Sequence, residues 1–201
     1  MPDKHLSSQF DSELNGVSSR VMELGGLVES QIRQAVYALS QLSIEVADEV
    51  AETEIRVNGM EIEIDRELSS IIARRQPTAR DLRLLIAISK TTANLERVGD
   101  EANKIARMAK SIAKSNSPRS LPTLDLRVSA DMASGLLRKA LDAFARLDTS
   151  AALDILKRRR SDRPGIRRLC AQTHHLHDGG PTHHHGQFGP AVHRQSHRAY
   201  R

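Results

Sequence analysis

Apolar residues recur at steps of three and four along most of the first 157 positions, a spacing that predicts long amphipathic helices. The expected helices cover residues 9 to about 42, about 45 to 75 and about 79 to 114. Their apolar stripes are, in order, Leu14, Val17, Val21, Leu24, Val28, Ala35 and Leu39; then Val50, Val57, Ile64, Leu68 and Ile72; then Leu84, Ile88, Leu95, Val98, Ala102, Ile105, Ala109 and Ile112. Three long helices with short connections predict an antiparallel bundle and an all-α fold.

The breaks in this pattern have local causes. Gln76-Pro77 should end the second helix, because proline disfavours the helical conformation in the residue before it. Thr78 and Asp81 then predict a capping box in which Asp replaces the usual Glu. The proline- and serine-rich segment 115–123 is typical of a linker.

A further helical pattern begins near Leu124 and pauses at Asp148-Thr149, where we expect the N-cap of another helix. Its apolar positions are Met132, Leu136 and Phe144. A weak repeat supports this organisation, since residues 35–47 align with 140–152 at an offset of 105. The matched positions are Ala35 with Ala140, Ala38 with Ala143, Leu42 with Leu147 and Ala47 with Ala152. We therefore expect a complete first three-helix bundle (1–115), a linker (116–123) and the start of a second bundle (124–157).

Composition favours a soluble helical protein. The chain has no Trp, two Tyr and three Phe, so its core must be aliphatic, which suits helices better than a β-sandwich. It has no signal-like segment and no apolar run of about 18 residues, so we expect a cytoplasmic protein without membrane insertion. The single cysteine, Cys170, excludes an internal disulfide and is too little for a thiolate metal site.

The net charge of +5 belongs to one end of the chain. Residues 158–201 contain nine Arg and two Asp, whereas residues 1–157 contain 21 basic and 23 acidic side chains. A basic tail can neutralise nucleic-acid phosphates, which leaves a nucleic-acid-binding protein as an alternative. However, no aromatic stacking platform or recognition motif accompanies the tail, so we expect no nucleic-acid partner.

Two pairs of acids carry the candidate chemistry. Glu61 and Asp65 lie one helical turn apart, as do Glu96 and Asp100, so each pair shares a helix face. If the two helices pack antiparallel, four carboxylates can converge on a hard or borderline cation. Gly99 supports close approach here, because a helix-interior glycine costs about 1 kcal/mol relative to alanine.

The alternative is that these acids are solvated and pair with Arg66 or Arg97. A carboxylate-bridged di-metal enzyme is a third possibility, but the Glu-x-x-His motif of such bundles is missing, and His5 is the one histidine before the tail.

Three strings in order, VNGMEIEID (57–65), IIARRQPTARDLRLLIAISKT (71–91) and LERVGDEANKIA (95–106), resemble the first half of PhoU-family proteins. The resemblance covers roughly residues 5–157. It implies tandem three-helix bundles in a cytoplasmic, often dimeric regulator without catalytic activity that restrains the phosphate regulon. It also implies two partners, the phosphate ABC transporter ATPase and a sensor histidine kinase. The implied cofactor is divalent or ferric metal (iron, manganese, magnesium or zinc), held by E/D-x-x-x-D motifs that fall on Glu61, Asp65, Glu96 and Asp100, and also on Glu54 and Asn58.

The segment after about residue 158 departs from the family. It contains THHLHDGGPTHHH (173–185), whose histidines can bind nickel or zinc adventitiously. Shifting the reading of its codons by one base permits ITYMMEDPRTIT and then FIAKAIERIG, which resemble the family's second half. We hypothesise that residues from about 158 are an out-of-frame, disordered tail and that regulation is impaired in this form. Resequencing codons 150 to 165 tests this, and an uninterrupted frame in several independent isolates would refute it.

Overall fold

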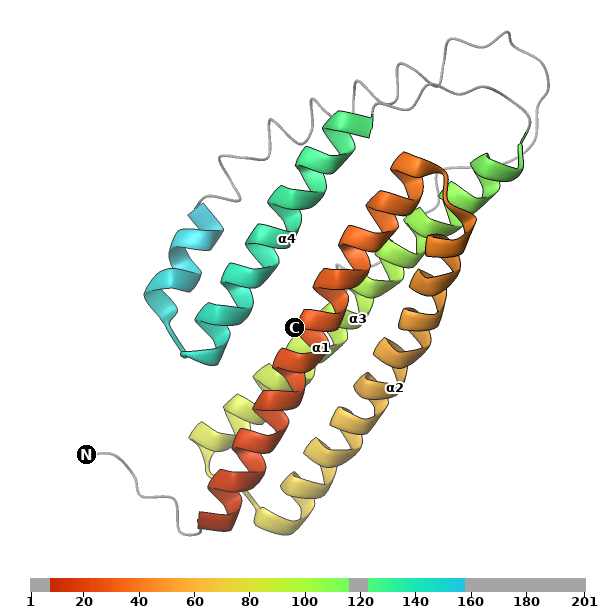
Figure 1. Cartoon of the computed structure of the whole chain (residues 1–201). Helices are drawn as coiled ribbons and strands as arrows, with labels where there is room; N and C mark the ends of the chain where they lie inside the picture. The colour runs from red at the N-terminus through yellow and green to blue at the C-terminus, as the bar shows by residue number, and fades with distance from the viewer. Residues whose placement is uncertain (1–7, 116–122, 158–201) are drawn as a thin grey trace, which may run out of the picture.

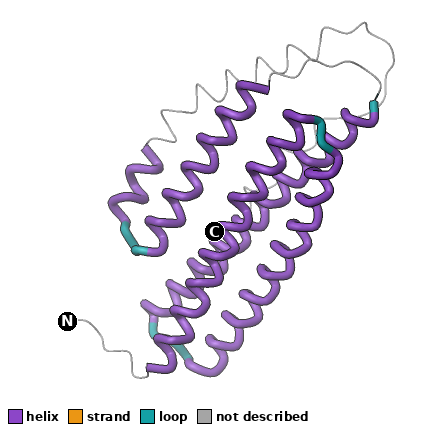
Figure 2. Tube along the Cα trace, in the orientation of Figure 1, coloured by secondary structure: helices purple, strands orange, loops and turns teal. Residues whose placement is uncertain are grey.

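The computed structural model describes residues 8–115 and 123–157, and within these ranges it contains helices and no strand (Figures 1 and 2). The helices are α1 (Ser8–Gln41), α2 (Ile44–Arg75), α3 (Ala79–Lys114) and α4 (Thr123–Ala145), and residues 149–157 are also helical. The predicted all-α fold is confirmed. The hypotheses about residues 158–201 and most of the expected linker lie outside the described residues.

Helices α1, α2 and α3 form an antiparallel bundle, and α4 lies beside it (Figure 1). Among these four helices, α4 contacts only α1, and it runs in the opposite direction to α1. Residues 149–157 then turn back alongside α4. None of the described helices is long and apolar enough to cross a membrane.

The core of the bundle changes character along its length. One part consists of large aliphatic side chains, among them Leu24, Val57, Ile64 and Ile88. The other part is rich in alanine; its members include Ala35, Ala38, Ala47, Ala102, Ala106 and Ala109. Small side chains let helices pack closely, and this buried cluster contains no aromatic residue.

Most predicted stripe positions are buried, with two corrections. Ile72 is 38% exposed and Ile71 takes the buried position, because the inward face advances by three residues after Leu68 rather than by four. Met132 is 42% exposed, since α4 turns Ala130 and Ser134 inward instead. In both cases the helix was predicted correctly and its rotational phase was not.

The helix boundaries agree with the sequence signals except at Thr78. Gln76 ends α2 in the left-handed conformation (φ 46°, ψ 60°), immediately before Pro77. Thr78 is the N-cap of α3, but its side chain makes no capping bond to the backbone. Its hydroxyl instead donates to the Asp81 carboxylate at 3.0 Å. The expected capping box is therefore wrong in its Thr-to-backbone half.

The weak repeat corresponds to a repeated corner. Leu42 and Leu147, 105 residues apart, have nearly the same left-handed φ, 52° and 53°. The residue after each caps the next helix: Ser43 Oγ accepts from Val46 N, and Asp148 Oδ1 accepts from the amides of residues 150 and 151. The predicted N-cap at Asp148 is confirmed, and the corner after α4 is a second copy of the corner between α1 and α2.

Candidate metal centre

Three predicted site residues converge between α2 and α3. Glu54 from α2 and Glu96 and Asp100 from α3 each place a carboxylate oxygen within 4.8 Å of the other two. Glu54 is only 4% exposed, and the two α3 acids are half-buried. The antiparallel packing of the two helices thus forms an acidic cluster from residues far apart in sequence.

Gly99 permits the close contact of three helices at this cluster. A Cβ atom at this position would lie 2.9 Å from Gln31 Oε1 of α1 and 3.0 Å from Glu54 Oε2 of α2. These separations are shorter than ordinary van der Waals contact, so any larger residue would displace both side chains. The conformational cost of a glycine in the α3 interior is thereby explained by the approach of Gln31 and Glu54.

Buried oxygen atoms of Glu54 and of three amide side chains on the bundle helices lack hydrogen-bond donors. Gln31 Nε2 donates to Glu54 Oε2 at 2.6 Å and to the Val50 carbonyl at 3.4 Å. Gln31 Oε1 and Glu54 Oε1 are buried and without a partner, as are the side-chain amide oxygens of Asn58 and Asn103. Since nearly all buried polar atoms in proteins are paired, unsatisfied acceptors of this kind fit a cation.

The electrostatics of the cluster also fit a cation. Burial raises the pKa of Glu54; the hydrogen bond from Gln31 opposes this shift, and the neighbouring Asp100 and Glu96 reinforce it. Burial, Glu96 and Asp65 raise the pKa of Glu61. In both carboxyls the charged form is thus disfavoured first by burial and then by the neighbouring negative charges.

The ion pairs expected as the alternative role of these acids do not form in the described part of the chain. Neither Arg66 nor Arg97 makes an ion pair there, although ten other ion pairs are present. The three clustered acids offer oxygen ligands only. Such a set suits magnesium, manganese or iron better than a soft metal.

The other predicted residues lie along the same face of α2 but contribute unequally. Glu61 is half-buried and close enough to Glu96 for the two charges to interact. Asn58 is half-buried, with its unpartnered oxygen described above. Asp65 is exposed, lies outside the three-acid cluster and accepts a hydrogen bond from Ser89 Oγ at 3.2 Å.

Sequence reasoning missed Gln31 and Asn103. Gln31 had a recognisable signal: it lies three residues after Val28 and four before Ala35, on the apolar stripe of α1, and is fully buried. A polar residue at such a position needs a partner. Asn103 follows Asp100 by three residues, a spacing that keeps it on the same face of α3.

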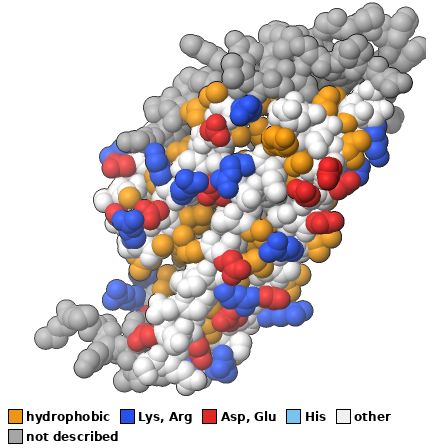
Figure 3. Space-filling model, in the orientation of Figure 1, with side chains coloured by type: hydrophobic (Ala, Val, Ile, Leu, Met, Phe, Trp, Pro, Cys, Tyr) orange, Lys and Arg blue, Asp and Glu red, His pale blue; other side chains and the backbone are white. Residues whose placement is uncertain are grey.

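A separate apolar cavity of about 630 Å³ lies between α3, α4 and residues 149–157. It is lined by side chains such as Leu95, Val98, Phe144 and Ile155. On the face of the molecule shown in Figure 3, charged side chains of both signs alternate with exposed hydrophobic ones. The cavity has none of the acids of the candidate metal centre in its lining.

The fold and the cluster define a helical-bundle protein with a buried, oxygen-rich site between two antiparallel helices. Residues 21–109 match the family described as PhoU domain. The relative "Phosphate-specific transport system accessory protein PhoU homolog" of Burkholderia sp is 46% identical over 158 residues, which are 78% of this chain and 67% of that protein. The Escherichia coli (strain K12) accessory protein PhoU is 41% identical over 155 residues, which are 77% of this chain and 64% of that protein. The chain belongs to the PhoU family.

Solved structures agree with this assignment. PhoU from Pseudomonas aeruginosa superposes with a TM-score of 0.76 at 38% identity, covering 84% of this chain and 81% of that one. The phosphate transport system regulatory protein PhoU from Streptococcus pneumoniae matches with a TM-score of 0.70 at 24% identity, over 82% and 74%, and supports the fold alone. The matched part of the chain spans 59–67% of the length of curated relatives from Burkholderia and Pseudomonas putida.

Proposed function

We propose that this chain is a cation-binding regulator of phosphate transport, and that it restrains the phosphate regulon when phosphate is plentiful. The names of the relatives, accessory proteins of a phosphate-specific transport system, support the regulatory role. The proposed partners are the phosphate ABC transporter ATPase and a sensor histidine kinase, with a homodimer as the working state. No membrane insertion and no catalytic activity are part of this proposal.

The observation that carries the proposal is the partly buried cluster of Glu54, Glu96 and Asp100 beside the unpartnered amide oxygen of Gln31. These three acids would hold the cation, with Asn58 and Glu61 alongside. A bound cation would offset the burial and the neighbouring negative charges that raise the pKa of Glu54, and would fasten α2 to α3. Asp65 belongs to the predicted motif, but it lies outside the three-acid cluster and accepts a hydrogen bond from Ser89, so we assign it no ligand role.

A metal titration of the purified full chain tests the site. We expect Glu54→Gln and Glu96→Gln each to weaken Mn²⁺ binding at least about tenfold, because each removes a charged oxygen ligand. Glu52→Gln is the matched control, since Glu52 is an exposed acid on the same helix and outside the cluster. Wild-type affinity in both cluster variants would contradict the proposed metal centre.

The regulatory role is tested in cells that lack their own PhoU-family protein. With ample phosphate, we expect this chain to repress a phosphate-regulon reporter. Glu54→Gln combined with Glu96→Gln should reduce this repression, because the double variant removes two ligands of the proposed cation. A double variant that represses as fully as the wild type would show that regulation does not depend on the cation.

A further inference from the structure

Gln31 is the one fully buried polar side chain that α1 places against the acidic cluster. It is 0% exposed, it is flanked along its stripe by Val28 and Ala35, and both are also 0% exposed. Its nearest polar neighbours come from α2, and its oxygen lies against the backbone of α3 at Gly99. A single amide therefore touches elements of all three helices of the bundle.

The hydrogen bonds fix which way this amide points. Its nitrogen faces two acceptors, Glu54 Oε2 at 2.6 Å and the Val50 carbonyl at 3.4 Å. The reverse orientation would direct the amide oxygen at the Val50 carbonyl and the Glu54 carboxylate and would lose both of these hydrogen bonds. The oxygen is thus held on the Gly99 side, where it has no donor.

We propose that Gln31 is the α1 component of the metal centre: its nitrogen positions Glu54, and its amide oxygen is a neutral ligand of the cation. This inference rests on the proposed function. An amide supplies an oxygen without adding a fourth negative charge to three carboxylates that already lie within 4.8 Å of one another. It also makes the site a property of the whole bundle, so that cation binding stabilises α1 as well as α2 and α3.

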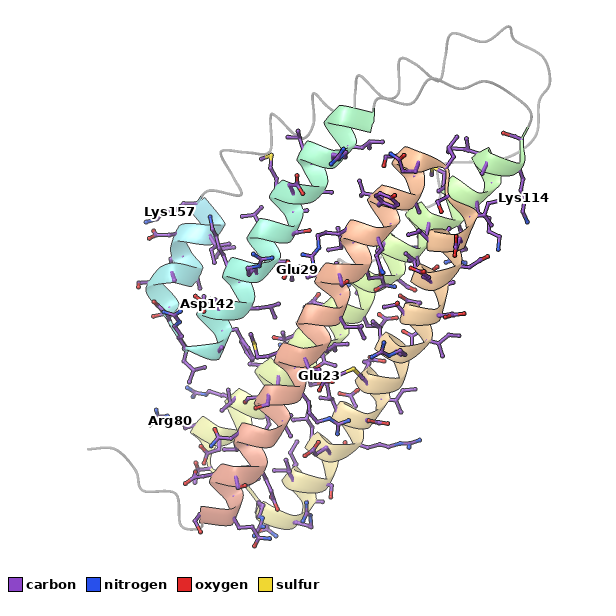
Figure 4. The ribbon with its side chains drawn as sticks, in the orientation of Figure 1. Glu23, Glu29, Arg80, Lys114, Asp142 and Lys157 are labelled. Atoms are coloured by element: carbon purple, nitrogen blue, oxygen red, sulfur yellow. The ribbon has the colours of Figure 1, made fainter. Side chains whose placement is uncertain are left out.

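Involvement of α1 gives the cation a route to α4. Two residues before Gln31, Glu29 is bonded to Arg138 of α4 and to Arg33. Glu29 lies on the side of α1 that faces α4 (Figure 4). A cation that orders α1 through Gln31 should therefore also stabilise the ion pair between Glu29 and Arg138, which joins α4 to the bundle.

The test measures Mn²⁺ affinity and the Mn²⁺-induced rise in the unfolding midpoint for two variants of the full chain. Gln31→Leu, studied well below its midpoint, should bind Mn²⁺ at least about tenfold more weakly, because it removes both the ligand oxygen and the donor to Glu54. Gln31→Glu should show a larger Mn²⁺-induced rise than the wild type, because a fourth carboxylate repels the others in the empty site and binds the cation in the filled one. Gln34→Leu, also on α1, is the control.

If Gln31 has only a structural role, the variants should give different Mn²⁺-binding results. If folded Gln31→Leu binds Mn²⁺ as tightly as the wild type, or if the rise in Gln31→Glu is no larger than in the wild type, the inference is wrong. Hydrogen exchange adds a second readout, since Mn²⁺ should slow exchange of the α1 amides around position 31 in the wild type and not in Gln31→Leu. If the wild-type protein does not bind Mn²⁺, the proposed function itself is wrong. A loss of binding confined to the Gln31 variants leaves the proposed function standing.

Discussion

The corner between α1 and α2 and the corner after α4 have the same backbone geometry in very different surroundings. In the first, Ala38 and Val50 are fully buried, because α3 covers them with its alanine-rich face. In the second, Ile155, the equivalent of Val50, is half-buried and lines the apolar cavity, and Leu153 and Leu156 beside it are more than half exposed. The same local sequence signals thus form a corner whether or not a third helix covers it.

The difference shows where the stability of the molecule resides. A fully buried aliphatic side chain contributes about 1.5–3 kcal/mol, and nearly all such residues belong to α1, α2 and α3. Of the three bundle helices, α4 packs closely on α1 alone, and the apolar cavity of about 630 Å³ lies between α4 and α3. Mutations in the three-helix bundle should therefore destabilise the protein most, and mutations in α4 should destabilise it least. Four comparisons test this difference and the way α4 is held.

The largest contrast should come from truncating one leucine in each region. Leu24→Ala, at a position with no exposed surface, should lower the free energy of unfolding by about 2–5 kcal/mol through lost burial and a cavity. Leu153→Ala, 58% exposed in the wild type, should change it by less than about 0.5 kcal/mol. Urea unfolding followed by circular dichroism measures both; equal effects would mean that Leu153 is covered in solution.

Matched alanines of the repeat give the next contrast. Ala47 and Ala152 occupy equivalent positions, but Ala47 is 4% exposed whereas Ala152 is exposed. Ala47→Leu should destabilise the protein by about 1–3 kcal/mol by overpacking the alanine-rich core. Ala152→Leu should be close to neutral, because leucine and alanine have similar helix propensity. Thermal unfolding compares the two, and similar losses would contradict the open corner.

Two adjacent glycines of α1 test how α4 is held. A Cβ on Gly25 would lie 2.5 Å from Leu141 Cδ1 of α4, whereas a Cβ on Gly26 would meet nothing within 4 Å. Gly25→Ala should destabilise by about 1–2 kcal/mol and speed hydrogen exchange in α4. Gly26→Ala should stabilise α1 by about 0.5–1 kcal/mol. Unchanged α4 exchange in Gly25→Ala would show that α4 is held by other contacts.

The smallest effect should be that of pH on the ion pair between α1 and α4. The hydrogen bond from Arg138, with help from Arg33, lowers the pKa of Glu29. A lowered carboxyl pKa contributes stability above the ordinary glutamate range, and this contribution is lost as pH falls through the lowered value. Because Arg138 is 70% exposed, the contribution should be below about 1 kcal/mol.

Arg138→Met should accordingly flatten the acid side of the stability curve. Its unfolding free energy should fall less between neutral pH and about pH 3 than that of the wild type. Arg146→Met is the control, since Arg146, just after α4, pairs with Asp142 of α4 and not with Glu29. If the unfolding free energy of Arg138→Met falls with decreasing pH as steeply as that of the wild type, Arg138 does not lower the pKa of Glu29.

Part of the candidate site could be anticipated from sequence. Glu96 and Asp100 lie one turn apart on one helix, so their common face follows from helical geometry. That Glu54, rather than Asp65, completes their cluster depends on the register between α2 and α3, which no local pattern specifies. The role of Gln31 depends on a third helix as well, and Gly99 acquires its meaning only when the side chains of α1 and α2 are placed against it.

By itself the sequence determined the helices, their ends and the repeated corner, because these depend on periodicity, proline and capping within a few residues. It did not determine the phase at which Ile71 replaces Ile72, or which acids meet. Those depend on how neighbouring helices pack, and packing is a property of residues far apart in the chain. The tertiary structure alone decided that one corner is covered by α3 and its copy is open, and that an amide from α1 joins the acids of α2 and α3.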